Sequence, residues 1–462
     1  MTSDCRCVLG IVLILGLAGA GSVDRAFAQS TGDSGETVVE APSSDGGQRT
    51  GSDSGSEDEE GNEVDVSELE RRLEVLAEEV ERLRSGEDSE IELTEQEVRA
   101  LGLAPSAAAT YRRSQGVSIA GYGEMLFENF AAENQAGDPT GKGSQFDFLR
   151  AIFYAGYRFN DKFLFNSEIE IEHADEIFVE FAYLDYLVHE NLGIRGGMVL
   201  MPMGLVNEFH EPTVFFGTER PVTEQVIIPS TWRENGGGIH GSVDMVSYRA
   251  FVVNGLVGSR FSANGIRSGR QKGSKAQAAN MAFTGRVDVT PTPGMFFGAS
   301  LYTGGSGQGD VVIDNTEFDI QTTIFDLHGQ AQIRGFDLRG LYARASIGDA
   351  AELNQSLGLS GAAGVAETMQ GGYFQVGYDV LSQVSGNRGV SLTPYVRLEQ
   401  VDTQATMPAG FVRSLTTDNT YTTLGVEVKP IPNIVLKADY AWVSNDAETL
   451  INQFNVNLGY AF

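Results

Sequence analysis

The alternation of apolar and polar side chains over residues 116–462 constrains the fold more than any other feature of the sequence. In the closing stretch FNVNLGYAF, every second residue from Phe454 to Phe462 is large and apolar, and Asn, Gly and Ala lie between them. Successive side chains of a β-strand point to opposite faces, so this spacing predicts strands with one apolar and one polar face. No long helical pattern interrupts the alternation, and we therefore expect an all-β region.

This region accommodates sixteen strand-like stretches, joined alternately by short and long connections. The short connections, such as RFNDK, HENLG and PIPN, contain the Gly, Pro, Asn or Asp residues that tight turns favour. Short turns at one rim, long loops at the other and an even number of strands are typical of outer-membrane barrels. The strands are predicted at 117–129, 145–158, 162–173, 176–188, 192–201, 233–243, 247–256, 281–290, 295–303, 318–330, 336–346, 369–381, 390–401, 419–429, 433–443 and 450–462.

The predicted fold class is therefore all-β, a sixteen-stranded antiparallel transmembrane β-barrel preceded by a short coiled-coil helix. In lipid the apolar faces point outward, and pairing of the first strand with the last removes the edges of the sheet. A soluble sandwich or solenoid would instead bury the apolar faces in a core, but no repeat period is present. The terminal Phe462 also resembles the C-terminal aromatic signal of bacterial outer-membrane proteins.

Residues 1–28 have the pattern of a secretory signal peptide. Arg6 precedes an apolar run from Val8 to Ala20, and small residues precede the expected cleavage after Ala28. The apolar run is shorter than the roughly 20 residues of a spanning helix, with an uncleaved anchor as the alternative. Export through such a signal agrees with a location in the bacterial outer membrane.

Three further segments precede the barrel, and we expect them to lie in the periplasm. Residues 29–64 are rich in Gly, Ser, Asp and Glu, which predicts a disordered acidic linker. Residues 65–86 predict a self-associating coiled-coil helix, with a lone amphipathic helix as the alternative. A short helix and a joint are expected over 87–115, and the barrel over 116–462. The heptad seam consists of Val66, Leu69, Leu73, Leu76, Val80 and Leu83.

Several classes of function find no support in the sequence. The formal net charge of -31 argues against a nucleic-acid partner, because phosphate binding needs clustered Lys and Arg. No motif identifies a nucleophile, so we predict that the protein is not an enzyme. His210 lies beside Glu208 and Glu211, but one histidine without a diagnostic spacing predicts neither a metal site nor a cofactor.

The longest connection follows the fifth predicted strand, and it carries a family resemblance. The motif RGGMVLMPMG (195–204), the loop that follows it, the GYGE that opens the barrel and the coiled coil resemble the phosphate-selective porin O and P family. This resemblance implies a sixteen-stranded trimeric porin in which the loop after the fifth strand folds into the lumen and forms the constriction.

The composition of the 202–232 loop agrees with such a position. It combines apolar side chains that could pack against a barrel wall with charges of both signs that could line a narrow path. Arg220 and Arg233 could alternatively pair with acidic residues of the loop and serve only to hold its fold. The candidate pore-lining and constriction residues are Glu124, Arg150, Glu168, Glu170, Glu172, Arg195, Glu208, Glu211, Arg220, Glu224 and Arg233.

The predicted function is an outer-membrane porin for passive diffusion of small hydrophilic solutes or ions. Two alternatives stay open, an outer-membrane anchor that uses its periplasmic coiled coil and an outer-membrane hydrolase. The expected partners are membrane lipid, lipopolysaccharide, the diffusing solutes and two further copies in a homotrimer. A basic cluster in a predicted external loop is expected to contact lipopolysaccharide phosphates; its members are Arg260, Arg267, Arg270, Lys272 and Lys275.

Ion selectivity is the point at which this sequence departs from the family resemblance. Acidic side chains outnumber basic ones, and Leu200 stands where the family motif leads us to expect a lysine. Strand alternation turns Glu168, Glu170 and Glu172 toward the lumen. We therefore predict a weakly cation-preferring or near-neutral pore.

Overall fold

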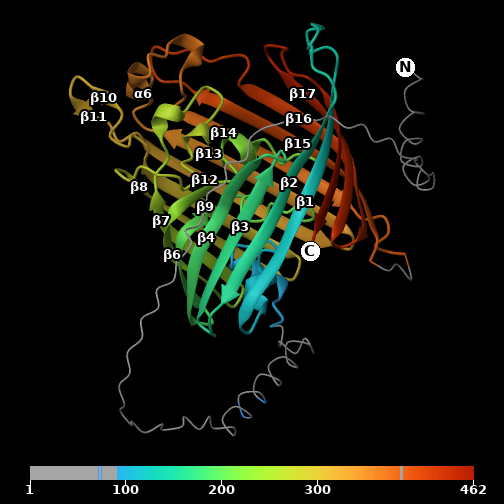
Figure 1. Cartoon of the computed structure of the whole chain (residues 1–462). Helices are drawn as coiled ribbons and strands as arrows, with labels where there is room; N and C mark the ends of the chain where they lie inside the picture. Colours follow the sequence, from blue (N-terminus) through green and yellow to red (C-terminus); the bar gives the residue numbers. More distant parts are fainter. Residues whose placement is uncertain (1–70, 72–73, 75–90, 385–388) are drawn as a thin grey trace, which may run out of the picture. The chain divides into compact units, whose positions relative to one another are not determined.

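Sixteen antiparallel strands pair into one closed barrel, in which β1 and β18 complete the ring (Figure 1). The structure is a computed structural model that describes residues 71, 74, 91–384 and 389–462. The predicted signal peptide, acidic linker and coiled-coil seam lie outside the described residues. The barrel strands are β1 Gly116–Phe130, β2 Gln145–Arg158, β3 Phe163–Glu172, β4 Glu176–His189, β5 Leu192–Leu200, β6 Arg233–Val243, β7 Val246–Asn254, β8 Met281–Thr292, β9 Met295–Gly305, β12 Gln321–Ile333, β13 Phe336–Ile347, β14 Thr368–Tyr378, β15 Ser391–Thr406, β16 Asp418–Ile431, β17 Ile434–Asn445 and β18 Gln453–Ala461.

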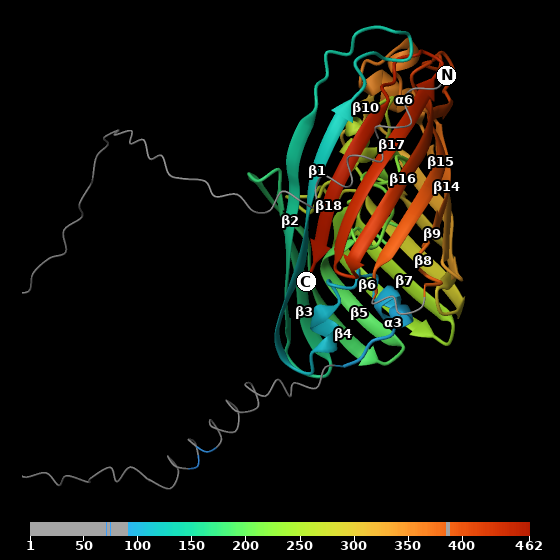
Figure 2. The same cartoon turned by 90° about the vertical axis from the view of Figure 1, so that its right-hand side faces the viewer.

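The closure of the ring explains the apolar, aromatic end of the chain. The register pairs Tyr122 with Ala461 and Phe130 with Gln453, and Figure 2 shows β18 (red) beside β1 (cyan). Gly121 and Phe462 then exchange both backbone hydrogen bonds, at 2.9 and 2.8 Å. The last strand therefore leaves no open sheet edge, which a barrel in lipid cannot tolerate.

The two faces of each strand follow the predicted alternation. On β3, Phe163 and Ile169 are exposed on the outside, whereas Asn166 and Glu168 on the opposite face are buried within the barrel. Large apolar side chains such as Ile119 are likewise exposed on the outer face. The sixteen-stranded prediction is confirmed, with an apolar outer wall and a polar inner wall. Among the described residues, no helix has the length and hydropathy needed to cross a bilayer.

The observed strand limits differ from the predicted ones in a few places. The strand expected from 318 begins at Gln321, because residues 306–320 form a separate hairpin of β10 (Val312–Ile313) and β11 (Thr316–Glu317). β15 continues to Thr406, which pairs with Thr368 of β14, so the predicted strand end at 401 is five residues short. Gln404, near the end of β15, donates to the carbonyls of Ala362 and Gly364 in the loop between β13 and β14. Simple alternation does not reveal such contacts.

Residues 91–113, which we call the N-terminal insert, pack against the inner wall. The insert contains α3 (Glu95–Ala100), which begins at a capping box of Thr94 and Glu97, and α4 (Ala109–Arg112). Leu103, Ala108 and other apolar insert residues are buried. Both views show the insert (blue) at the lower end of the barrel. A short helix was predicted here, but its burial inside the barrel was not.

The remaining helices of residues 116–384 and 389–462 are short and lie in the long loops. They occur between β5 and β6, between β7 and β8, and between β13 and β14. Their bounds are α5 Thr223–Val226, η1 Gly258–Arg260, η2 Arg267–Gly269, α6 Ala350–Ser356 and η3 Gly361–Ala363.

Candidate functional site

The connection between β5 and β6, residues 201–232, crosses the interior of the barrel. We call it the lumen loop. Its Glu208 lies 3.0 Å from Arg249 on β7, and its Phe215 carbonyl accepts a hydrogen bond of 2.8 Å from Lys437 on β17. β7 and β17 are eight places apart in the ring of sixteen strands, so the loop bridges opposite walls. The expectation that this loop folds into the lumen is met.

The first part of the lumen loop joins a buried network of charges on the wall. Glu208 contacts Arg249 at 3.0 Å and Arg286 at 3.5 Å. Asp288 contacts the same two arginines, at 3.0 and 2.7 Å. His328 lies 2.8 Å from Asp288 and extends the network along the wall. All these side chains are buried, so each charge relies on its partners for stabilisation.

Two predicted constriction residues instead hold the N-terminal insert. Glu211 accepts hydrogen bonds from the backbone N–H groups of Ser106, at 2.9 Å, and Ala107, at 3.3 Å. Arg195 donates to the carbonyl of Leu101 at 3.0 Å and to the hydroxyl of Tyr111 at 3.0 Å. Because these bonds fasten the insert to the loop and the wall, both residues act at the lower end of the barrel.

The acidic wall predicted on β1 and β3 is present, and Arg150 pairs with three of its carboxylates. This side chain on β2 lies 2.8 Å from Glu124, 3.2 Å from Glu170 and 3.7 Å from Glu172. Glu124 also accepts a hydrogen bond from Asn457 at 3.1 Å. The four predicted residues are therefore brought together as one network, in which a single arginine serves three carboxylates.

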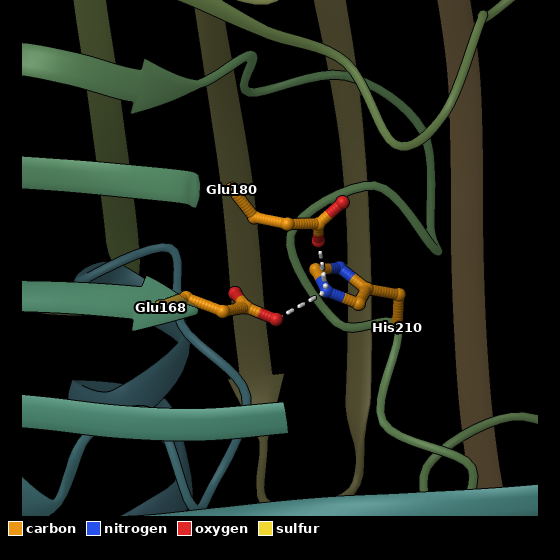
Figure 3. Close-up of side chains that lie close together, drawn as sticks. All are labelled: Glu168, Glu180 and His210. Carbon is orange, nitrogen blue, oxygen red and sulfur yellow. Dashed lines mark hydrogen bonds and ion pairs between the residues drawn. The ribbon is translucent and has the colours of Figure 1, made fainter. Parts of the chain in front are cut away.

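Glu168, the remaining predicted carboxylate of β3, meets the lumen loop directly (Figure 3). His210 Nε2 lies 3.2 Å from Glu168 Oε1 and 3.1 Å from Glu180 Oε2. Arg233, at the start of β6, lies 3.0 Å from the other oxygen of Glu180. Glu208 and Glu211, which lie beside His210 in the sequence, point to other partners. All three side chains of the His210 group are buried.

The second part of the lumen loop is attached mainly through its backbone carbonyls. Lys437 donates to the carbonyls of Phe215 and Gly217, at 2.8 and 3.0 Å. Arg339 and Arg397 donate to the carbonyls of Val214 and Glu219, at 2.7 and 3.2 Å. Cationic side chains on β13, β15 and β17 thus hold this part of the loop against the wall.

Glu224 stabilises the loop internally. Its carboxylate accepts bonds from the N–H groups of Leu205 and Val206, at 2.8 and 2.7 Å, and from the hydroxyl of Tyr373 at 2.6 Å. Burial raises the pKa of Glu224 to about 7, although these hydrogen bonds act in the opposite direction. Glu224 therefore has a structural role, and it lines no open path in this arrangement.

Basic side chains gather in a pocket on the wall side of the lumen loop. Arg220 and Arg233 line it together with Arg267 and Arg270, which come from the loop between β7 and β8. Arg270 donates to the carbonyl of Pro229 at 3.0 Å. The predicted external basic cluster is therefore divided, because Arg267, Arg270 and the exposed Lys272 line this pocket, whereas Arg260 and Lys275 are exposed and do not line it. The pocket is completed by Arg150, Glu170, Glu172, Phe178, Thr231 and Lys272.

Sequence reasoning missed Glu180, which contacts both His210 and Arg233. The register pairs Glu168 with Phe181 and Ile169 with Val179, so Glu180 is the additional residue of a β-bulge. A bulge places two neighbouring residues toward the same side, and both Glu180 and Phe181 are buried. Alternation alone could not identify this bulge. The alternation also predicts inward acidic and basic side chains on β7, β8, β15 and β17, but these were not included among the candidate pore-lining residues.

A relative found by sequence shows the kinship of the chain. The chain is 38% identical over 357 residues to an uncharacterized protein of Aquifex aeolicus (strain VF5). The matched region covers 73% of this chain and 78% of that protein. The two proteins belong to one family. No model of a known protein family matches the chain.

Solved structures of outer-membrane channels also resemble the chain. They include OmpF of Salmonella typhi in complex with daunomycin, with a TM-score of 0.49, 12% identity and coverage of 76% of this chain and 98% of that one. DcaP of Acinetobacter baumannii has a TM-score of 0.47 and 11% identity, and the match covers 76% of this chain and 98% of that one. An anion-selective porin of Comamonas acidovorans has a TM-score of 0.45 and 12% identity, and the match covers 75% of this chain and 100% of that one. At these values the likeness says nothing about the solutes of this chain.

Proposed function

We propose that this porin-like barrel allows passive diffusion of small hydrophilic solutes across the bacterial outer membrane. The observation that carries the proposal is the lumen loop, which bridges opposite walls and contacts charged side chains inside a barrel with an apolar exterior. A loop in this position narrows the path for ions and brings them close to fixed charges. The N-terminal insert narrows the lumen further at its lower end.

The geometry supports small anions as the preferred solutes. Six basic side chains and two carboxylates line the pocket beside the lumen loop. Arg150 pairs with both carboxylates, whereas Arg220 Nη2 is buried without a hydrogen-bond partner among the described residues. Two of the three carboxylates that led us to expect a cation preference, Glu170 and Glu172, are thus already paired. We infer that the uncompensated basic groups dominate the local field.

Reversal potentials in planar bilayers under a KCl gradient test this proposal. The unmodified protein should favour chloride, and Arg220→Gln should shift the reversal potential toward potassium. Lys275→Gln is the matched control, because Lys275 is exposed in the same loop that supplies Arg267 and Arg270. Potassium preference in the unmodified protein would refute anion preference. A barrel that conducts no ions would refute diffusion altogether and favour the anchor.

Finer assignments follow from the resemblance in the sequence. We propose common ancestry with the phosphate-selective porin O and P family, supported by residues 195–204 and by the inward position of the lumen loop. A homotrimer, a periplasmic N-terminal segment, contact of the exposed basic residues with lipopolysaccharide and the absence of enzyme activity belong to the same proposal. Crosslinking of the protein in outer membranes, with and without residues 29–90, tests the trimer and the role of the predicted coiled coil.

A further inference from the structure

We propose that Glu168, Glu180 and His210 form a binding site for one divalent transition-metal ion, which joins the lumen loop to β3 and β4. The three side chains come from three different segments and converge on one point (Figure 3). One ligand atom from each lies within 4.8 Å of the others, and no second group of this kind occurs among the described residues. This site is independent of the choice of diffusing solute.

The tautomer of His210 makes Nε2 available as a ligand. Nδ1 lies 2.9 Å from the backbone carbonyl of Asn207, and a carbonyl can only accept, so Nδ1 carries a hydrogen. In the neutral ring, Nε2 then holds a lone pair, and that lone pair faces two carboxylates. Such a hydrogen bond from the far ring nitrogen to a carbonyl is the usual support of a metal-binding histidine.

Hydrogen bonding does not satisfy the carboxylates at this point. A protonated Nε2 carries one hydrogen, and its geometry fits a bond to Glu168 Oε1. Glu180 Oε2 and Glu168 Oε2 are then buried with no hydrogen-bond partner among the described residues. A buried carboxylate oxygen without a partner is costly. A cation between the three groups would contact all of them at once.

The distances and the surroundings fit a metal ion. Zn²⁺ bonds of about 2.0–2.2 Å at tetrahedral angles place neighbouring ligand atoms about 3.3–3.6 Å apart. The observed separations of Nε2 from the two carboxylates are 3.2 and 3.1 Å. Thr231 and Arg233 hold Glu180 Oε1 at 2.7 and 3.0 Å, which turns Oε2 toward His210. One imidazole and two carboxylates suit ions such as Zn²⁺, Fe²⁺ or Mn²⁺.

Asn207 connects this site to the shape of the whole lumen loop. Its amide nitrogen donates to the carbonyls of Met201, at 2.7 Å, and Trp232, at 3.0 Å, which are the two ends of the loop. Its side-chain oxygen, Oδ1, accepts a hydrogen bond of 2.6 Å from the backbone N–H of Trp232. An ion on His210 would therefore fix the base of the loop as well as its contact with the wall.

Metal content tests the proposal directly. The purified full-length barrel is stripped with chelator, exposed to Zn²⁺, washed with excess Mg²⁺ to remove weakly held ions, and analysed by mass spectrometry of the metal. We expect one Zn²⁺ per chain and a higher unfolding temperature with Zn²⁺ than without it. X-ray absorption should show one imidazole among oxygen ligands.

The variants distinguish this site from other acidic groups. His210→Gln and Glu168→Gln should each lose the ion and the thermal shift. His328→Gln is the matched control and should keep both, because the nitrogens of His328 face different carboxylates, Asp326 and Asp288. If the unmodified barrel retains no Zn²⁺, or if a folded His210→Gln or Glu168→Gln barrel retains as much as the control, the proposal is overturned. A lack of Zn²⁺ binding would not contradict ion conductance through the barrel, so the proposed diffusion is tested separately by the bilayer recordings.

Discussion

The two parts of the lumen loop are fastened to opposite walls by different chemistry. Residues 201–211 place carboxylates and a histidine into buried charge networks with β3, β4, β7 and β8. Residues 212–232 mostly offer backbone carbonyls to cationic side chains of β13, β15 and β17. Loss of a buried ionic partner leaves an uncompensated charge, whereas loss of a donor to a carbonyl leaves a neutral acceptor. The first attachment should therefore tolerate substitution less well than the second.

Removal of both attachments should have the largest effect. Deletion of residues 206–230 should raise the single-channel conductance several-fold, because ions would gain the cross-section that the loop occupies. Deletion of 133–139, in the exposed loop between β1 and β2, is the control and should leave the conductance near that of the unmodified protein. An unchanged conductance after the first deletion would mean that the lumen loop does not form the constriction.

Substitution of one anchor on each wall should separate the two kinds of attachment. Arg286→Met leaves Glu208 and Asp288 with fewer partners and should lower the free energy of unfolding by about 3–5 kcal/mol. Lys437→Met removes two bonds to loop carbonyls and should cost about 1–3 kcal/mol. Urea titrations of the refolded barrels would give both values, with exposed Arg260→Met as the control. Equal losses for the two variants would contradict the distinction between the walls.

A change of pH should have the smallest effect, on the motion of the loop. Burial raises the pKa of Glu211 and of Glu224 from 4.5 to about 7, so the neutral forms are favoured in the folded loop. This contribution to stability is complete below about pH 4.5 and is lost as the pH rises toward 7. Current fluctuations from loop motion should be more frequent at pH 8 than at pH 5.

Glu219 of the lumen loop has a pKa that burial likewise raises to about 7. Glu224→Gln should therefore weaken the pH dependence without abolishing it, because it removes only one of the titrating carboxyl groups. Glu133→Gln, in the exposed loop between β1 and β2, serves as the control. Fluctuations that stay constant from pH 5 to pH 8 in the unmodified protein would show that these carboxyl groups do not influence the loop.

The sequence by itself determined the barrel. Alternation with a period of two depends only on neighbouring residues, and lipid outside a closed sheet requires every outward side chain to follow it. It therefore predicted all sixteen strands, the inward direction of Glu124, Arg150 and Glu168, and the closure by the last strand. Family resemblance supplied the inward position of the 202–232 loop.

Only the tertiary structure decided which charges meet inside the barrel. Glu180 turns inward through a bulge, His210 reaches it from the lumen loop, and Arg267 arrives from yet another loop. Contacts of this kind join residues far apart in the sequence, and they depend on where the loops and the N-terminal insert come to rest. Alternation specifies the face of a strand on which a side chain lies, but the partner of a buried charge is set by packing across the lumen.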